Sequence, residues 1–107
     1  MSLNINSLNK EEMDVLEILK NVIEPATEVG IIDLGLVYSI SIVSNEVIIN
    51  LTFTSSDYSM GDSIIHAIEQ IISNTYPGFE AKVNIVWFPE WSLEMVSEEG
   101  KLALSEL

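Results

Sequence analysis

Cysteine is absent from the 107-residue chain. Disulfide bonds, thiolate nucleophiles and thiolate metal sites all require cysteine, so the sequence excludes all three. The absence is compatible with any cellular compartment. Direct ligation of a metal or of a cluster by this chain's own thiols is therefore excluded.

Basic residues are scarce as well. There is no arginine, and four lysines face seventeen acidic residues, which gives a net charge of −13. Nucleic-acid binding needs several basic side chains to displace phosphate counterions, and anionic membrane surfaces need them too. We therefore expect no nucleic-acid and no membrane partner. The negative charge leaves three interpretations open: solubility alone, a basic protein partner or a metal cation.

Long apolar runs and common catalytic motifs are also missing. No run approaches the roughly 20 residues of a membrane-spanning helix, and the N-terminal residues lack the pattern of a secretory signal, so the expected location is cytoplasmic. The chain has no Gly-x-Ser-x-Gly elbow, and its five glycines are scattered singly. A serine-hydrolase elbow and a glycine-rich phosphate loop are thus excluded.

The apolar residues that are present predict one α+β domain over residues 1–107. They make up 48% of the chain and repeat at helical or strand spacing. The expected elements are a helix over 9–24 that Pro25 ends, strands over 36–43 and 46–54, a helix from Ser59 or Asp62 to Pro77, a strand over 79–88, and a last helix capped by Ser92 or Ser97. This order predicts a two-layer α-β-β-α-β domain, with helices covering one face of a small sheet.

Alternation along the strands assigns side chains to the two faces of the sheet. Ser44-Asn45 is expected to form the hairpin turn between the first two strands. The side chains predicted to face the core are Leu36, Tyr38, Ile40, Ile42, Val47, Ile49, Leu51 and Phe53. Thr52 and Thr54 are expected to point away from the core, at the end of the second strand.

Three sets of side chains are candidates for chemistry. His66, the only histidine, is near Asp62 and Glu69 on one helix, where an exposed histidine is the alternative to a ligand. Glu24, Glu28 and Asp33 cluster around the first loop, where a solvated loop is the alternative to a hard-cation site. Trp87 and Trp91 flank Pro89, in either a packed corner or an interaction hot spot.

Five motifs, in order along the chain, resemble one known family. They are Glu24-Pro25, Asp33-Leu34-Gly35-Leu36-Val37-Tyr38, Thr52-Phe53-Thr54-Ser55, Met60-Gly61-Asp62, and Trp87-Phe88-Pro89-Glu90-Trp91-Ser92 with Met95-Val96-Ser97-Glu98-Glu99. Over roughly Leu16 to Leu104, the chain is similar to the domain shared by SufT-type proteins, PaaD subunits of phenylacetate degradation and the MIP-type cytosolic iron–sulfur assembly factors.

The resemblance implies an iron–sulfur cluster assembly fold and a site that gathers the first loop and the threonine loop. The site residues that it implies are Glu24, Asp33, Leu34, Thr52, Thr54 and Ser55. Tyr58 and Trp91 are further candidates for a partner or cluster site. Two departures stand out: the family's cysteine and the proline after it are Tyr58 and Ser59, and its Asp-Pro-Glu glutamate is Ala26. Tyrosine is a poor substitute for a soft thiolate ligand.

The expected function is an accessory, non-catalytic factor in iron–sulfur cluster assembly or delivery that acts through protein–protein contacts. Its expected partners are assembly or client proteins, and a cluster is expected only transiently or with a partner. Alternatives are a non-catalytic PaaD-like subunit of a multicomponent oxygenase, a diverged paralogue without cluster chemistry, and a metal-dependent enzyme that uses Glu24, Asp33 and His66. A homo-oligomer stays open.

Overall fold

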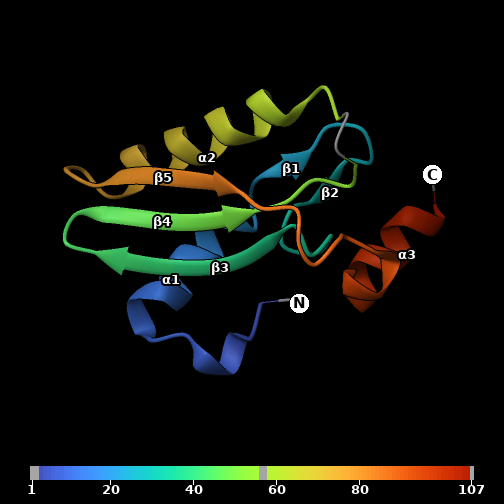
Figure 1. Ribbon diagram of the computed structural model, residues 1–107, viewed down its shortest axis with the longest axis horizontal. Helices are drawn as coiled ribbons and strands as arrows, with labels where there is room; N and C mark the ends of the chain where they lie inside the picture. Colours follow the sequence, from blue (N-terminus) through green and yellow to red (C-terminus); the bar gives the residue numbers. More distant parts are fainter. Residues whose placement is uncertain (1–2, 56–57, 107) are drawn as a thin grey trace.

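A computed structural model describes residues 3–55 and 58–106 of the chain, and it confirms an α+β domain (Figure 1). Ser56 and Asp57, in the predicted loop before the second helix, lie outside the described residues. The elements in chain order are η1 (Ile5–Ser7), α1 (Lys10–Leu19), β1 (Ile23–Glu24), β2 (Val29–Gly30), β3 (Val37–Val43), β4 (Glu46–Leu51), α2 (Gly61–Thr75), β5 (Glu80–Ile85), η2 (Leu93–Met95) and α3 (Glu98–Ser105).

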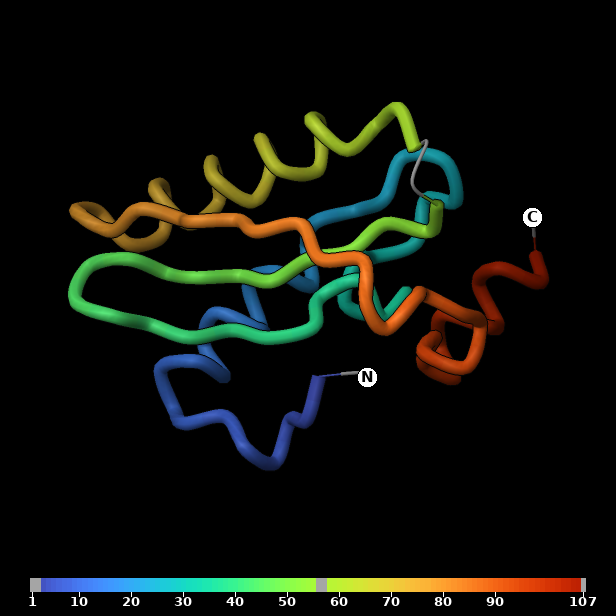
Figure 2. The backbone as a smooth tube through the Cα atoms, viewed as in Figure 1, coloured from blue at the N-terminus to red at the C-terminus, as the bar shows by residue number. Residues whose placement is uncertain are grey.

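The main sheet has the strand order β3-β4-β5. Strands β3 and β4 are antiparallel and joined at Ser44-Asn45, as predicted, with Ser44 in the left-handed region at φ 55°. Strand β5 pairs parallel to β4, and α2 provides the crossover that parallel pairing requires. Because β4 and β5 run in the same direction, the loop after β4 and the segment after β5 leave the sheet at the same end (Figure 2).

The core lies between the sheet and the helices α1 and α2, which cover one face (Figure 1). The predicted isoleucine stripe of α2 is confirmed, because Ile64, Ile68 and Ile72 are fully buried. Helix α3 lies beyond the end of the sheet, where it contacts β2. Its predicted cap is settled in favour of Ser97, whose hydroxyl accepts the backbone N–H of Gly100.

The predicted helix over residues 9–24 is too long. Its start is correct, since Asn9 and Glu12 form a capping box, but α1 ends at Leu19 and Ile23–Glu24 form β1, paired antiparallel to β2. The residues after the helix include the β-branched Val22 and Ile23, which favour strands, and Pro25 disfavours helical backbone at Glu24. Val22 is still buried. The apolar spacing of the sequence therefore predicted the burial of this residue correctly, but it did not predict that the helix ends before it.

The predicted alternation along β3 fails at Tyr38. The pairing register shifts between Val37 and Ser39, which is a β-bulge. Consequently Val37 is buried in the core, while the Tyr38 hydroxyl donates to the Pro89 carbonyl oxygen at 2.6 Å. Periodicity cannot reveal one extra residue in a strand, so the sequence assigned Tyr38 to the wrong face.

The second and third predicted strands are also shorter than expected, because β4 ends at Leu51 and β5 ends at Ile85. Thr52 follows β4 and is buried, with 1% of its surface exposed. Its side chain hydrogen-bonds Tyr38, on the side of the sheet that the C-terminal segment covers. The C-terminal segment therefore contacts the face opposite the helices at this end of the sheet.

Candidate functional site

The Glu24 carboxylate is a buried acceptor at the turn between β1 and β2, with only 2% of the residue exposed. It accepts the backbone N–H of Ala26 at 2.5 Å, and the backbone N–H and hydroxyl of Thr27 at 2.9 and 2.7 Å. The Tyr58 hydroxyl donates to it as well. The interpretation of Glu24 as part of a solvated loop is therefore wrong, because donors of the chain replace water around its carboxylate.

These bonds set the protonation of both groups. Burial pushes the pKa of Glu24 upward, but the hydrogen bonds from Tyr58, Thr27 and the Ala26 backbone outweigh it and hold the pKa below its ordinary value. Burial, the hydrogen bond to Glu24 and the carboxylate charge all raise the pKa of Tyr58. At neutral pH a neutral phenol thus donates to a charged carboxylate, which is a charge-assisted hydrogen bond.

Tyr58 also begins a row of aromatic rings that leads to the segment after β5. Its ring stacks on the Phe53 ring, with the two centroids 5.4 Å apart. The centroids of the Phe53 and Trp87 rings are 6.1 Å apart. Helix α2 begins at Gly61, where a Cβ would lie 2.8 Å from the Phe53 ring. Glycine at this position therefore allows the start of α2 to pack against the row.

A second group of contacts joins the Asp33-Leu34-Gly35 block to the C-terminal segment. The Ser97 hydroxyl donates to Asp33 Oδ1 and the Ser97 backbone N–H to the Asp33 carbonyl oxygen, both at 2.8 Å. Trp91 Nε1 donates to the Leu34 carbonyl oxygen at 2.7 Å. Gly35 has φ +77°, which favours glycine. Hydrogen bonds to Asp33 and Leu34 therefore hold the C-terminal segment against the rest of the domain.

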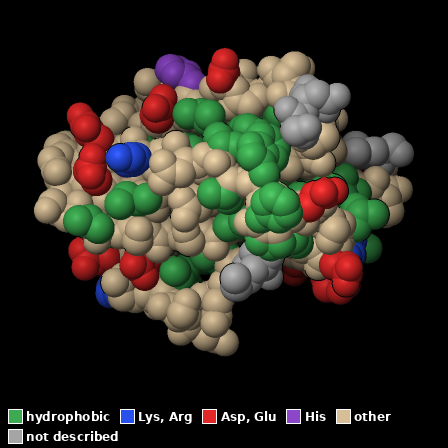
Figure 3. Space-filling view, in the orientation of Figure 1, with side chains coloured by type: hydrophobic (Ala, Val, Ile, Leu, Met, Phe, Trp, Pro, Cys, Tyr) green, Lys and Arg blue, Asp and Glu red, His purple; other side chains and the backbone are tan. Residues whose placement is uncertain are grey.

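The threonine loop and the C-terminal segment enclose a pocket of about 350 Å³, named the aromatic pocket here. It is lined by Thr52, Phe53, Thr54, Ser55, Trp87, Phe88, Glu90 and Trp91. Figure 3 shows hydrophobic side chains gathered on this side of the molecule, over the end of β5 and the segment after it. Four of the eight predicted site residues thus line one pocket. Tyr58 is not among the lining residues, but its ring stacks on Phe53, which is.

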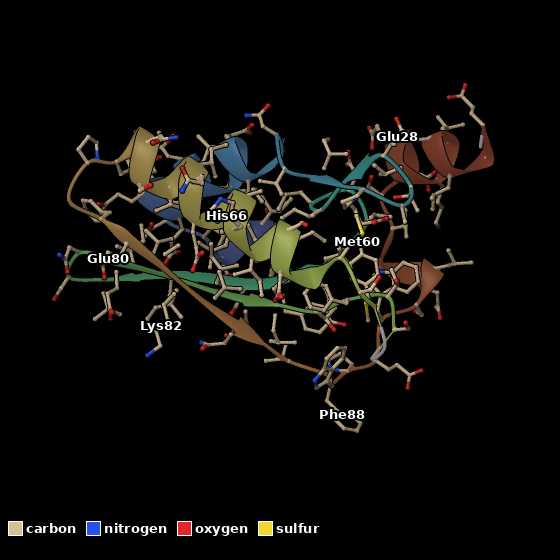
Figure 4. The ribbon with its side chains drawn as sticks, turned by 90° about the horizontal axis from the view of Figure 1, so that it is seen from above. Glu28, Met60, His66, Glu80, Lys82 and Phe88 are labelled. Atoms are coloured by element: carbon tan, nitrogen blue, oxygen red, sulfur yellow. The ribbon has the colours of Figure 1, made fainter. Side chains whose placement is uncertain are left out.

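The remaining predicted site residues do not meet in one place. Glu24 pairs with Tyr58, whereas Asp33 pairs with Ser97, so the expected carboxylate cluster is divided. Glu28 is exposed and His66 lies apart from it on α2 (Figure 4). Within residues 3–55 and 58–106, no three side chains of histidine, aspartate or glutamate are placed to hold a metal ion.

Sequence reasoning missed the partners that hold this site together. Thr27, which donates twice to Glu24, carried no signal in the sequence. Ser97 was identified only as a cap, and its bond to Asp33 joins residues 64 positions apart. Phe53 was assigned to the core, but its link between Tyr58 and Trp87 depends on the tertiary arrangement.

Among the described helices, none combines the length and the hydropathy that crossing a bilayer would require.

Comparison with known proteins agrees with the sequence resemblance. The family described as iron–sulfur cluster assembly protein matches residues 12–85. The chain is 34% identical over 84 residues to the Fe–S protein maturation auxiliary factor SufT of Staphylococcus aureus, a match that covers 78% of this chain and 96% of that protein. It is 28% identical over 103 residues to an Fe–S protein maturation auxiliary factor of Porphyromonas gingivalis, covering 95% of this chain and 98% of that one.

The fold agrees as well. The crystal structure of a domain of unknown function, DUF59, from Bacillus anthracis superposes with a TM-score of 0.86 at 35% identity, covering 95% of this chain and 98% of that chain. The family match extends over more than half of the chain, and it includes the Glu24 turn, the threonine loop and Tyr58. This chain therefore belongs to the iron–sulfur cluster assembly protein family.

Proposed function

We propose that this chain is an accessory, non-catalytic factor in the maturation of iron–sulfur proteins, and that it acts through protein–protein contacts. Its relatives in Staphylococcus aureus and Porphyromonas gingivalis are named Fe–S protein maturation auxiliary factors. The observation that carries the proposal is an exposed aromatic surface beside a site that has no thiol. On this view iron–sulfur clusters are cargo that partner proteins ligate.

The exposed aromatic surface is suited to a protein partner. Phe88 has 88% of its surface exposed and Trp87 has 43%, directly beside the threonine loop. Large aromatic residues dominate the binding energy of many protein interfaces, because each buries a large apolar area on contact. A solvent-exposed phenylalanine at this position contributes little to the fold, and contact with a partner would bury it.

The polar groups support a non-catalytic role. The Glu24 carboxylate is engaged by four donors of the chain, and Asp33 is engaged by Ser97. A general base needs a free lone pair within reach of a substrate proton. Within the described residues, each oxygen of the Glu24 carboxylate accepts two of these donors, so this carboxylate holds a turn and offers no free lone pair. Asp33 accepts the Ser97 hydroxyl through Oδ1 and holds the C-terminal segment.

Complementation tests the maturation role. In a strain that lacks the gene, we expect the activity of an iron–sulfur enzyme such as aconitase to fall while its protein level stays unchanged, and the wild-type chain should restore it. Phe88→Ala should restore it poorly. Leu102→Ala is the matched control, because Leu102 is also exposed, at 68%, but lies on α3. Unchanged aconitase activity in the deletion strain would refute the maturation role.

Photo-crosslinking tests the contact mode. A benzoylphenylalanine residue placed at position 88 should crosslink to iron–sulfur assembly or client proteins in the cell, whereas the same residue at position 102 should not. If the products at position 88 were instead oxygenase subunits, the chain would act in an oxygenase complex and the proposed partners would be wrong.

A further inference from the structure

The aromatic pocket combines aromatic walls with one free carboxylate. Phe53, Trp87, Phe88 and Trp91 contribute rings, and Thr52 and Thr54 contribute hydroxyl groups. Glu90 is exposed and, among the described residues that line the pocket, provides the only carboxylate. At about 350 Å³, the pocket lies at the small end of the range for ligand sites, which suits one long side chain better than a large cofactor.

The charges around this pocket favour a cation. None of the four lysines lines this pocket. The two ion pairs among the described residues join Lys10 to Asp14 and Lys20 to Glu17, so neither of them involves Glu90. Asp62 lines the neighbouring pocket, which shares Phe53 and Trp87 with this one. With a net charge of −13, the chain as a whole attracts positive groups.

The walls favour arginine among the cations that a protein can offer. Guanidinium groups stack on aromatic faces more often than ammonium groups do, and their planar fork matches a carboxylate with two parallel hydrogen bonds. The Trp91 ring is held by its bond to the Leu34 carbonyl oxygen, so this wall is fixed before any ligand arrives. A fixed wall lowers the entropic cost of binding.

We propose that the aromatic pocket binds an arginine side chain of a partner protein, with the guanidinium group against the rings and paired with Glu90. This proposal rests on the proposed function only in taking the partner to be a protein. It predicts a partner segment that carries an exposed arginine, and it gives a role to Phe88, which lines the pocket. The Phe88 side chain projects outward from the segment after β5 (Figure 4).

Nuclear magnetic resonance offers a direct test, because the chain has two tryptophans and both line the pocket. The ¹⁵N-labelled full chain is titrated with a capped pentapeptide that has arginine between alanines, and with the same peptide carrying neutral citrulline. We expect the arginine peptide to shift both indole N–H signals and to bind about tenfold more tightly than the citrulline peptide, since the latter lacks the charge for cation–π and ion-pair contacts. A lysine peptide should bind more weakly than the arginine peptide.

Two variants identify the groups responsible. Glu90→Gln should weaken binding of the arginine peptide by about threefold, as expected for loss of an exposed ion pair. Phe88→Ala should weaken it by about as much through loss of a cation–π contact. Glu94→Gln removes an exposed carboxylate four positions along the chain that is not among the lining residues, and this variant should bind like the wild type after allowance for its smaller negative charge.

Equal affinity for the arginine and citrulline peptides, or equal weakening by Glu90→Gln and Glu94→Gln, would overturn the proposal. Tighter binding of the lysine peptide would overturn the assignment to arginine. Because this titration contains no iron–sulfur protein, its failure leaves the complementation result intact. Conversely, failure of complementation leaves the measured peptide affinity unchanged, so the two proposals fail separately.

Discussion

Replacing Tyr58 by phenylalanine removes one hydrogen bond and leaves the aromatic packing in place. The lost bond joins the phenol to the buried Glu24 carboxylate, while the stacking on Phe53 is kept. A hydrogen bond to a charged group contributes about 1.5–3 kcal/mol. Three other donors still bond Glu24 in the variant, and Tyr58 is only partly buried. We therefore expect Tyr58→Phe to lower the free energy of unfolding at pH 7 by about 1.5 kcal/mol, the lower end of this range.

The pH dependence of this difference follows from the two pKa shifts. The pKa of Glu24 is lowered in the folded state from 4.5, so the bond stabilises the fold above that pH and loses its effect as acid protonates the carboxylate. The pKa of Tyr58 is raised from 10.0, so its contribution is complete below pH 10 and declines as the unfolded chain ionises above it. The wild type should therefore exceed Tyr58→Phe in stability most clearly between these limits.

Urea unfolding followed by tryptophan fluorescence measures this difference. With a slope of roughly 1–1.5 kcal/mol per molar urea for a chain of this size, Tyr58→Phe should lower the midpoint by about 1 M at pH 7. The control is Tyr76→Phe, because the described residues provide no hydrogen bond to the Tyr76 hydroxyl while its ring packs on Phe79. If both variants lose the same stability, or if the Tyr58→Phe difference does not decline as the pH is lowered stepwise below 4.5, the hydrogen bond to Glu24 is not the cause.

Three further substitutions test other parts of the structure. Ser97→Ala removes the cap of α3 and the bond to Asp33, so we expect a loss of about 1–2 kcal/mol, with faster amide exchange in α3 as the local readout. Gly35→Ala should destabilise the domain by about 2 kcal/mol or more in thermal unfolding, because a side chain at φ +77° is strained and its Cβ would collide with the Met95 backbone. Ile68→Ala empties a fully buried core position and should cost about 2–5 kcal/mol in urea unfolding. Equal stability of the wild type and any one of these variants would contradict the role given to that residue.

The helices and the sheet were largely predictable because their signals are local. The isoleucine stripe of α2 and the turn at Ser44-Asn45 follow from spacing and turn chemistry, and the structure confirms both. The errors occurred where local patterns compete. Val22 and Ile23 continue the apolar spacing of α1, but the chain leaves the helix after Leu19 and pairs Ile23 with Gly30.

The candidate site was harder to predict, because its parts meet through the tertiary fold. The sequence motifs named Glu24, Tyr58 and the threonine loop as candidate positions, but they did not show which of these residues would touch. The phenol of Tyr58 bonds a carboxylate 34 positions away, and the bulge at Tyr38 turns that side chain toward Pro89. Sequence periodicity cannot predict contacts of this kind, because such contacts depend on where the loops leave the sheet.

The sequence by itself determined the exclusions and the family. Without cysteine the chain offers no thiolate, and with four lysines it offers no basic surface, whatever its fold. Only the tertiary structure decided which groups of the candidate site are already engaged: the Glu24 carboxylate is buried and bonded by donors of the chain, whereas Glu90 lines a pocket with four aromatic residues. The reason is physical, because composition sets which groups exist, whereas burial and long-range contacts set which of them remain free to bind.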